Sequence, residues 1–156
     1  MARNSLKTKI NLFLGSYEVT ITSSFRVVVP PDFRKLLGRS AILTKGFEDN
    51  LLIVPVDKWE TLVSPLRKSP LFDANSKEMT RYLVANSYSI SLDQQGRFVV
   101  PVSLRGVLNL ARVPSKLVVA GMLDYIEIWP VNKWNQKQVS LVKNVDKIAK
   151  VLNERE

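Results

Sequence analysis

The sequence predicts a mainly β fold with flanking helices, an α+β class built from two related halves. Short alternating apolar runs meet polar turns, and the same pattern occurs twice along the chain. The composition, 46% hydrophobic and 24% charged residues, is typical of a globular protein. At 156 residues the chain can form one ordinary domain or two small fused halves.

The clearest segment is a predicted hairpin at residues 88–100. An alternating run ends at Leu92, a polar turn follows, and a second apolar run begins at Phe98. Asp93 can bond the backbone two residues later, and Gly96 can take a positive φ without steric cost. Arg97 stands just past the turn, where a fixed backbone would direct a long cation outward. In isolation, this pattern is also compatible with an ordinary hairpin that carries a surface arginine.

An earlier segment repeats this hairpin. Residues 17–30 align with residues 88–101, so that Arg26 corresponds to Arg97, 71 positions later, and both copies end in Val-Val-Pro. The second copy then gains four residues, and Lys58-Trp59 corresponds to Lys133-Trp134, 75 positions later. A repeat of this length indicates an internal duplication.

Each half should contain a hairpin, a short helical turn, two more strands and a helix. We expect Asp32 and Ser103 to serve the free N–H groups of the short helical turns, and Asp57 and Asn132 to cap the later helices. A connecting helix should begin at Ser76. The expected segments are short helical turns at 32–37 and 103–108, strands at 41–44, 51–54, 117–120 and 125–129, and helices at 57–66, 76–86 and 133–152.

Two features of the helices favour structural roles. Trp59 and Trp134 occupy the same place in the repeat, which favours anchoring of each helix to its barrel over ligand binding. The last helix has an apolar stripe, typical of a core or subunit contact, and its lysines are more typical of a solvated face than of DNA contacts. The stripe consists of Val139, Val142, Val145, Ile148, Ala149 and Leu152.

The composition excludes most enzyme designs. Cysteine and histidine are both absent, which removes thiolate nucleophiles, disulfides, the usual zinc sites and the usual neutral-pH base. The acidic residues of the repeat turns form no nucleophile–base pattern. We therefore expect no enzyme, no cofactor, no metal and no small-molecule substrate. No apolar run is long enough to span a membrane, and we expect a cytoplasmic protein.

The net charge points to a polyanion as partner. Lys and Arg outnumber Asp and Glu by 23 to 14, which gives a formal charge of +9. A nucleic acid is one such polyanion, with a protein that is merely basic as the alternative. Arg3, Lys7 and Lys9 lie in a basic N-terminal arm, for which a solvated terminus is favoured over phosphate contacts.

With the two hairpins aligned, the sequence resembles the MraZ family of bacterial transcription regulators. The resemblance runs from Phe13 to about Trp134 and depends on the duplicated Asp-x-x-x-Arg motif with its Val-Pro, Gly and Pro-x-x-x-Trp landmarks. It implies two AbrB-like swapped-hairpin halves that form one β-barrel-like body. It also implies a nucleoid-associated homo-oligomeric ring that binds promoter repeats of a division and cell-wall gene cluster, generally as a repressor.

The resemblance carries over to individual residues of the two motifs. Asp93, Gly96 and Arg97 match the family pattern and are the principal DNA-binding candidates. In the first copy only Arg26 matches, because Thr22 and Phe25 replace the aspartate and the glycine. Since a bulky residue adopts a positive φ with difficulty, we expect the first turn to have a different shape.

Other arginines are candidates for supporting phosphate contacts, with ordinary surface charges as the alternative. These candidates are Arg34, Arg39 and Arg105. The degenerate first motif also leaves open a non-DNA interaction module or an antitoxin-like one. The expected organisation is an arm at 1–12, a first repeat at 13–70, a connecting helix at 71–87, a second repeat at 88–134 and a C-terminal helix at 135–156.

Overall fold

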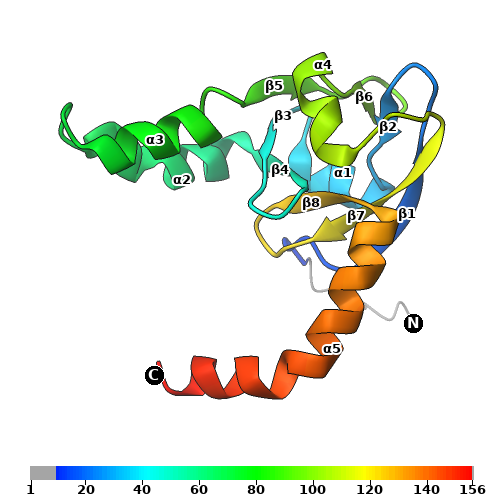
Figure 1. Ribbon diagram of the computed structural model, residues 1–156. Coiled ribbons are helices and arrows are strands. Elements are labelled where there is room, and N and C mark those ends of the chain that lie inside the picture. The colour runs from blue at the N-terminus through cyan, green and yellow to red at the C-terminus, as the bar shows by residue number, and fades with distance from the viewer. Residues whose placement is uncertain (1–9, 156) are drawn as a thin grey trace, which may run out of the picture.

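A computed structural model describes residues 10–155 of the chain (Figure 1). The predicted N-terminal arm at residues 1–12 therefore falls mostly outside the described residues. In the first half the elements are β1 (Ser16–Ile21), β2 (Arg26–Val28), α1 (Pro31–Leu37), β3 (Ser40–Lys45), β4 (Leu51–Pro55), α2 (Val56–Lys68) and α3 (Ala74–Leu83). In the second half they are β5 (Tyr88–Ser91), β6 (Arg97–Val99), α4 (Val102–Arg105), the 3-10 helix η1 (Gly106–Leu108), β7 (Ser115–Gly121), β8 (Ile126–Pro130) and α5 (Val131–Asn153).

The strands form two antiparallel sheets. Six strands make one sheet in the order β1-β7-β8-β4-β3-β5, and β2 and β6 make a separate two-stranded ribbon. The mainly β, α+β class is confirmed. The six-stranded sheet is not closed into a barrel, however, because β1 and β5 are its two edges and do not pair with each other. The β-barrel-like body suggested by the resemblance is therefore an open sheet with a ribbon beside it.

The two halves exchange their hairpins, as predicted. The first strand of each half joins the sheet of the other half, since β1 pairs with β7 and β5 pairs with β3. Equivalent residues meet each other at two places: Val27 pairs with Phe98, and Leu52 pairs with Glu127. Equivalent residues can face each other in this way only at a pseudo-twofold axis. The ribbon and the centre of the large sheet thus both lie on that axis.

The core lies between the large sheet and the ribbon. Each strand directs alternate side chains inward, and both halves contribute equivalent side chains. The central strand β4 is buried on both faces. Removing these apolar surfaces from water is the main stabilising term of the fold. The largest fully buried side chains are Phe33, Ile21, Leu43, Leu51, Ile53, Leu104, Leu108, Leu117, Ile126, Ile128, Val27 and Val29.

Prolines, and not the predicted polar caps, begin the helices that follow a strand. Pro30, Pro55, Pro101 and Pro130 occupy the N-cap positions, with φ between −57° and −52° and no side-chain cap bond. The fixed φ of proline sets the chain direction at each of these boundaries. The expected capping by Asp32, Ser103, Asp57 and Asn132 is therefore wrong.

The connecting helix α3 has a side-chain cap, but one that differs from the prediction. Asp73, and not Ser76, is the N-cap residue, and its carboxylate accepts bonds from the backbone N–H groups of Asn75 and Ser76. The last turns of α3 are attached to the sheet by a bond from Thr44 Oγ1 to the carbonyl of Leu83, 2.7 Å long.

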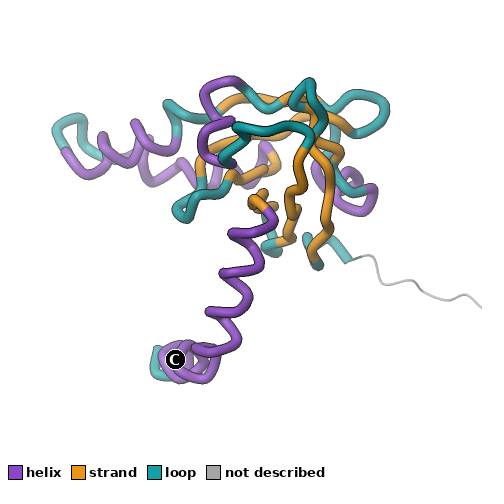
Figure 2. The backbone as a smooth tube through the Cα atoms, turned by 45° about the vertical axis from the view of Figure 1, so that its right-hand side comes forward, coloured by secondary structure: helices purple, strands orange, loops and turns teal. Residues whose placement is uncertain are grey.

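Two helical parts extend from the sheet. The α2–α3 hairpin projects on one side, and α5 projects separately and bends along its length (Figures 1 and 2). Trp134 of α5 packs edge-on against Trp129, with ring centroids 6.0 Å apart, which supports its anchoring role. Beyond this base α5 has no buried residue. None of the helices in the described part of the chain is long and apolar enough to span a membrane.

Candidate nucleic-acid interface

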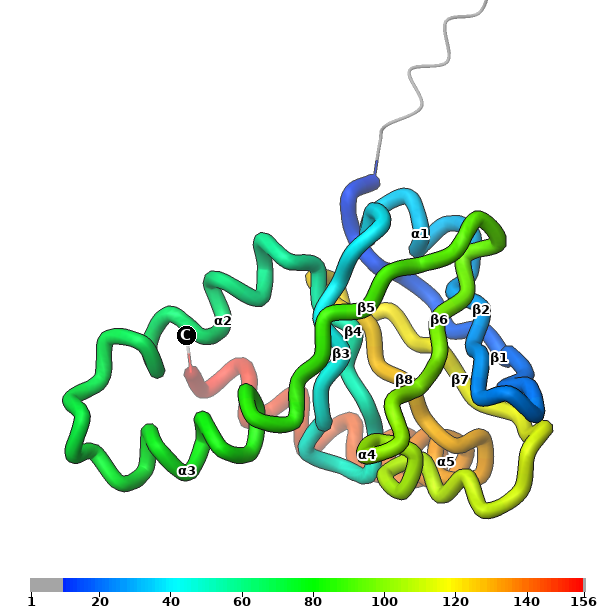
Figure 3. The backbone as a smooth tube through the Cα atoms, turned by 90° about the horizontal axis from the view of Figure 1, so that it is seen from above, coloured from blue at the N-terminus to red at the C-terminus, as the bar shows by residue number. Residues whose placement is uncertain are grey.

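The β2–β6 ribbon places both motif arginines on one exposed face. Arg26 pairs with Val99 and Val28 pairs with Arg97, and directly paired residues in antiparallel strands point to the same side. Val27 and Phe98 point to the opposite side, where they are 0% and 4% exposed. The turns that precede the two arginines lie at opposite ends of the ribbon, as Figure 3 shows from above. The chain thus presents two arginines, one from each half, on one small surface.

The intact turn is closed by Asp93. Its Oδ1 accepts bonds from the backbone N–H groups of Gln95 and Arg97, both 2.9 Å long, and its Oδ2 accepts a bond of 2.9 Å from Arg97 Nε. The bond from the Arg97 backbone is the largest cause that lowers the pKa of Asp93 below its usual 3.8. Gly96 has the predicted positive φ, 75°. The carboxylate therefore fixes both the turn and the direction of the arginine.

The first turn has the same backbone conformation, contrary to the expectation of a different shape. Thr22 N–H donates to the Arg26 carbonyl at 3.0 Å and Phe25 N–H to the Thr22 carbonyl at 2.9 Å; the two equivalent bonds of the second turn are both 2.9 Å. Phe25 has a φ of 60°, close to that of Gly96. Thr22 Oγ1 also accepts a bond of 3.1 Å from the Arg26 N–H, so a hydroxyl replaces the aspartate as backbone acceptor. These bonds outweigh the strain at Phe25.

The two arginines differ in how their side chains are held. Arg97 is paired with Asp93, whereas no salt bridge involves Arg26 in the part of the chain that the structure describes. Arg26 is also the more exposed of the two. The expectation that Arg26 lacks an orienting carboxylate is therefore confirmed for residues 10–155.

Two further arginines lie beside the turns. Arg34 Nε donates to the Val29 carbonyl at 2.7 Å, and Arg105 Nε donates to the Val100 carbonyl at 2.9 Å. These bonds are equivalent in the repeat. The sequence indicated that Arg34 and Arg105 correspond, but it gave no signal for their backbone partners, because the partner carbonyls lie five residues earlier and outside any regular pattern.

A shallow groove borders the intact turn. It places Arg34 and Arg39, two candidates for phosphate contacts, next to Asp93. The third candidate, Arg105, lies by the other turn, where its guanidinium carbon is 3.7 Å from the centre of the Phe25 ring. The groove is lined by Arg34, Gly38, Arg39, Leu92, Asp93, Gln94 and Gly96.

The fold and the ribbon define a class, the duplicated swapped-hairpin proteins. The two halves meet on a pseudo-twofold axis, and each half presents one equivalent arginine on the ribbon at that axis. A family model described as "MraZ protein, putative antitoxin-like" matches both halves, at residues 12–82 and 83–150. The chain belongs to the MraZ family.

Several proteins named "Transcriptional regulator MraZ" are similar to this chain. The one from Herpetosiphon aurantiacus is 35% identical over 79% of this chain and 84% of its own length. The one from Clostridium tetani is 34% identical over 80% of this chain and 86% of its own length. The one from Clostridium acetobutylicum is 32% identical over 92% of this chain and 98% of its own length. These relatives support a regulator of transcription.

Proposed function

We propose that this protein is a sequence-specific transcriptional regulator that binds double-stranded DNA through the exposed face of the β2–β6 ribbon. The observation that carries the proposal is the shared position of Arg26 and Arg97 on that face, in a chain of charge +9. Family membership supports it, since the relatives are named as transcriptional regulators. The expected target is a set of promoter repeats of a division and cell-wall gene cluster, with repression as the expected outcome.

The chemistry of the contact follows from the arginine side chain. A guanidinium can bind phosphate, or it can donate two parallel bonds to O6 and N7 of guanine in the major groove. Such a guanine contact discriminates between bases by about 1 to 3 kcal/mol. Arg97 is already oriented by Asp93, so it loses less conformational freedom on binding than a free arginine does. We therefore assign the principal base contact to Arg97 and a secondary one to Arg26.

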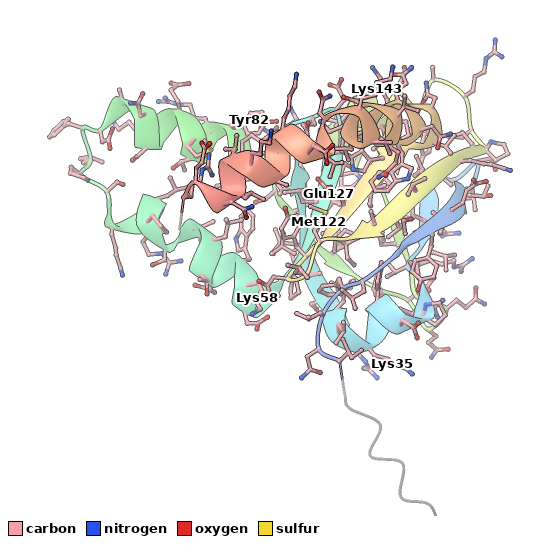
Figure 4. All side chains as sticks on the ribbon, turned by 90° about the horizontal axis from the view of Figure 1, so that it is seen from below. Lys35, Lys58, Tyr82, Met122, Glu127 and Lys143 are labelled. Carbon is pink, nitrogen blue, oxygen red and sulfur yellow. The ribbon has the colours of Figure 1, made fainter. Side chains whose placement is uncertain are left out.

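Self-association completes the proposal. Helix α5 leaves its apolar stripe exposed in the single chain, including Val142 at 74% and Val145 at 55%. An apolar surface of this kind favours a contact with another protein surface, and a second copy of the chain would bury it. In a ring, successive subunits would bind successive DNA repeats, and each later contact would form at a high effective concentration. Figure 4 shows α5 in front of the sheet, with Lys143 along its length.

A binding assay with DNA fragments tests the proposal. Fragments selected from genomic DNA should contain tandem repeats, and Arg97→Ala should weaken binding to them at least tenfold, about 1.4 kcal/mol. Arg67→Ala is a matched control, because Arg67 lies on α2, away from the ribbon, and loses the same charge. Binding by Arg97→Ala that equals binding by Arg67→Ala would contradict the site assignment.

The family description favours one alternative, an antitoxin-like or other non-DNA interaction module. Its swapped hairpins would then bind a protein partner. A stable protein that co-purifies with the chain, together with no retention of double-stranded DNA at low salt, would support this alternative and contradict DNA binding.

A further inference from the structure

Each half of the molecule covers the arginine-bearing turn of the other half with an arginine of its own. Arg34, from α1 of the first half, lies against Gly96 in the second turn: a Cβ added to Gly96 would be 2.1 Å from Arg34 Nε and 2.4 Å from its Cζ. Arg105, at the end of α4 in the second half, lies over the Phe25 ring in the first turn, 3.7 Å from its centre. Gly96 and Phe25 are equivalent positions. The two contacts are therefore one arrangement that occurs twice.

Backbone bonds complete this crossed arrangement. The Val29 N–H donates to the Gly96 carbonyl at 2.9 Å, and the Val29 carbonyl accepts the bond from Arg34 Nε. In the other half, the Val100 N–H donates to the Phe25 carbonyl at 2.9 Å, and the Val100 carbonyl accepts the bond from Arg105 Nε. Each arginine thus holds the strand end to which the opposite turn is bonded, and it also covers that turn.

We propose that Arg34 and Arg105 are positioning residues that hold the DNA-binding turns in a crossed manner: Arg34 holds the Asp93–Arg97 turn, and Arg105 holds the Thr22–Arg26 turn. This inference goes beyond the proposed function and depends on it for its consequence in DNA binding. It differs from the expectation that these arginines contact phosphates, because here their guanidinium groups contact the turns and backbone carbonyls of the protein and not DNA.

The crossed arrangement explains how the degenerate turn keeps its shape. The second turn leaves no room for a side chain at Gly96, because Arg34 occupies that space. The first turn has a phenylalanine there, and Arg105 stacks on its ring. A cation over an aromatic face is a favourable contact that offsets part of the strain of the positive φ. A lysine could not replace either arginine fully, since it lacks both the planar group and the Nε donor.

Hydrogen–deuterium exchange without DNA tests the crossed pattern. Arg105→Lys should speed exchange in peptides that cover residues 22–26 by roughly three- to tenfold and leave residues 93–97 unchanged, whereas Arg34→Lys should do the reverse. Phe25→Leu keeps an apolar side chain without the ring and should reproduce the effect of Arg105→Lys. Arg67→Lys is the control. An effect of Arg105→Lys on both turns equally, or on neither, would overturn the inference.

The salt dependence of DNA binding separates positioning from phosphate contact. Arg105→Gln should lower the preference for repeat DNA over unrelated DNA and leave the slope of log affinity against log salt unchanged. A phosphate contact would instead lower that slope by about one and weaken all sequences alike, and that result would overturn the inference. If the unchanged protein binds no DNA, the proposed function fails while the exchange experiment still decides whether Arg34 and Arg105 hold the turns.

Discussion

The two arginine-bearing turns have the same backbone but are stabilised by different side chains. The second turn uses the residues that such a turn favours, a carboxylate at Asp93 and a glycine at the positive φ. The first turn has Thr22 and Phe25 at these places and keeps the same bonds. The shape of a swapped hairpin therefore depends on the strand to which it is bonded and on the helix that covers it, as well as on its own turn residues.

A second difference concerns the arginines that the turns present. Arg97 is fixed by a carboxylate, whereas Arg26 is positioned through its backbone. Arg97 therefore has a more defined direction, and Arg26 can adapt to its partner. In a base contact the fixed arginine gives the larger gain in affinity, because less conformational freedom is lost on binding. This is the physical reason for assigning unequal roles to two equivalent positions.

The largest expected loss of stability comes from a substitution in the ribbon that supports both turns. Phe98 and Val27 pair on the pseudo-twofold axis and form the buried side of the ribbon. Phe98→Ala should lower the free energy of unfolding by about 3 to 5 kcal/mol, because it opens a cavity beneath both turns. Urea unfolding measures this change. A loss below about 1 kcal/mol would mean that the ribbon is not a central part of the core.

A smaller loss of stability is expected from substitutions that compare backbone strain with steric contact. Gly96→Ala introduces backbone strain and a clash with Arg34. Gly38→Ala introduces the strain alone, because Gly38 has a φ of 71° and no atom lies within 4 Å of an added Cβ. We expect Gly38→Ala to cost about 1 kcal/mol of stability and Gly96→Ala about 1 kcal/mol more. Thermal or urea unfolding of the two variants gives the difference. Equal losses would show that Arg34 moves away without cost.

The features of the fold and of the candidate site that could be predicted from the sequence are those that depend on nearby residues. The hairpins and the candidate arginines follow from patterns within a few residues, and the duplication follows from the constant offset between the two copies. The conformation of Phe25 does not, because it depends on Arg105, 80 positions later, which lies over it only after the halves exchange hairpins. The helix starts were predicted to within one or two residues, but their caps were wrong: polar residues of the N-cap type follow each strand, and the preceding proline occupies the N-cap position instead.

A smaller change should make the two turns more alike. Thr22→Asp gives the first turn the carboxylate that the second turn has, so Arg26 could form the pair that Arg97 forms. An exposed ion pair of this kind contributes at most about 1 kcal/mol, so we expect DNA binding to tighten by up to about fivefold. Thr22→Asn is the matched control without the charge. Weaker binding by Thr22→Asp than by Thr22→Asn would show that Arg26 needs its freedom to reach DNA.

The response to acid should distinguish the two turns with no substitution at all. The backbone and side-chain bonds from Arg97 lower the pKa of Asp93 below 3.8 in the folded protein. A carboxyl group with a lowered folded pKa stabilises the fold fully above its unfolded pKa, and this stabilisation is lost as the pH falls through the folded pKa. Thr22 does not ionise, so the first turn lacks this dependence.

Nuclear magnetic resonance between about pH 5 and pH 2, the range in which aspartate titrates, measures this difference. The amide signal of Arg97 should shift with a midpoint below 3.8, and the amide signal of Arg26 should shift much less. Equal shifts of the two signals would show that the acid response belongs to the whole ribbon and not to the Asp93 turn.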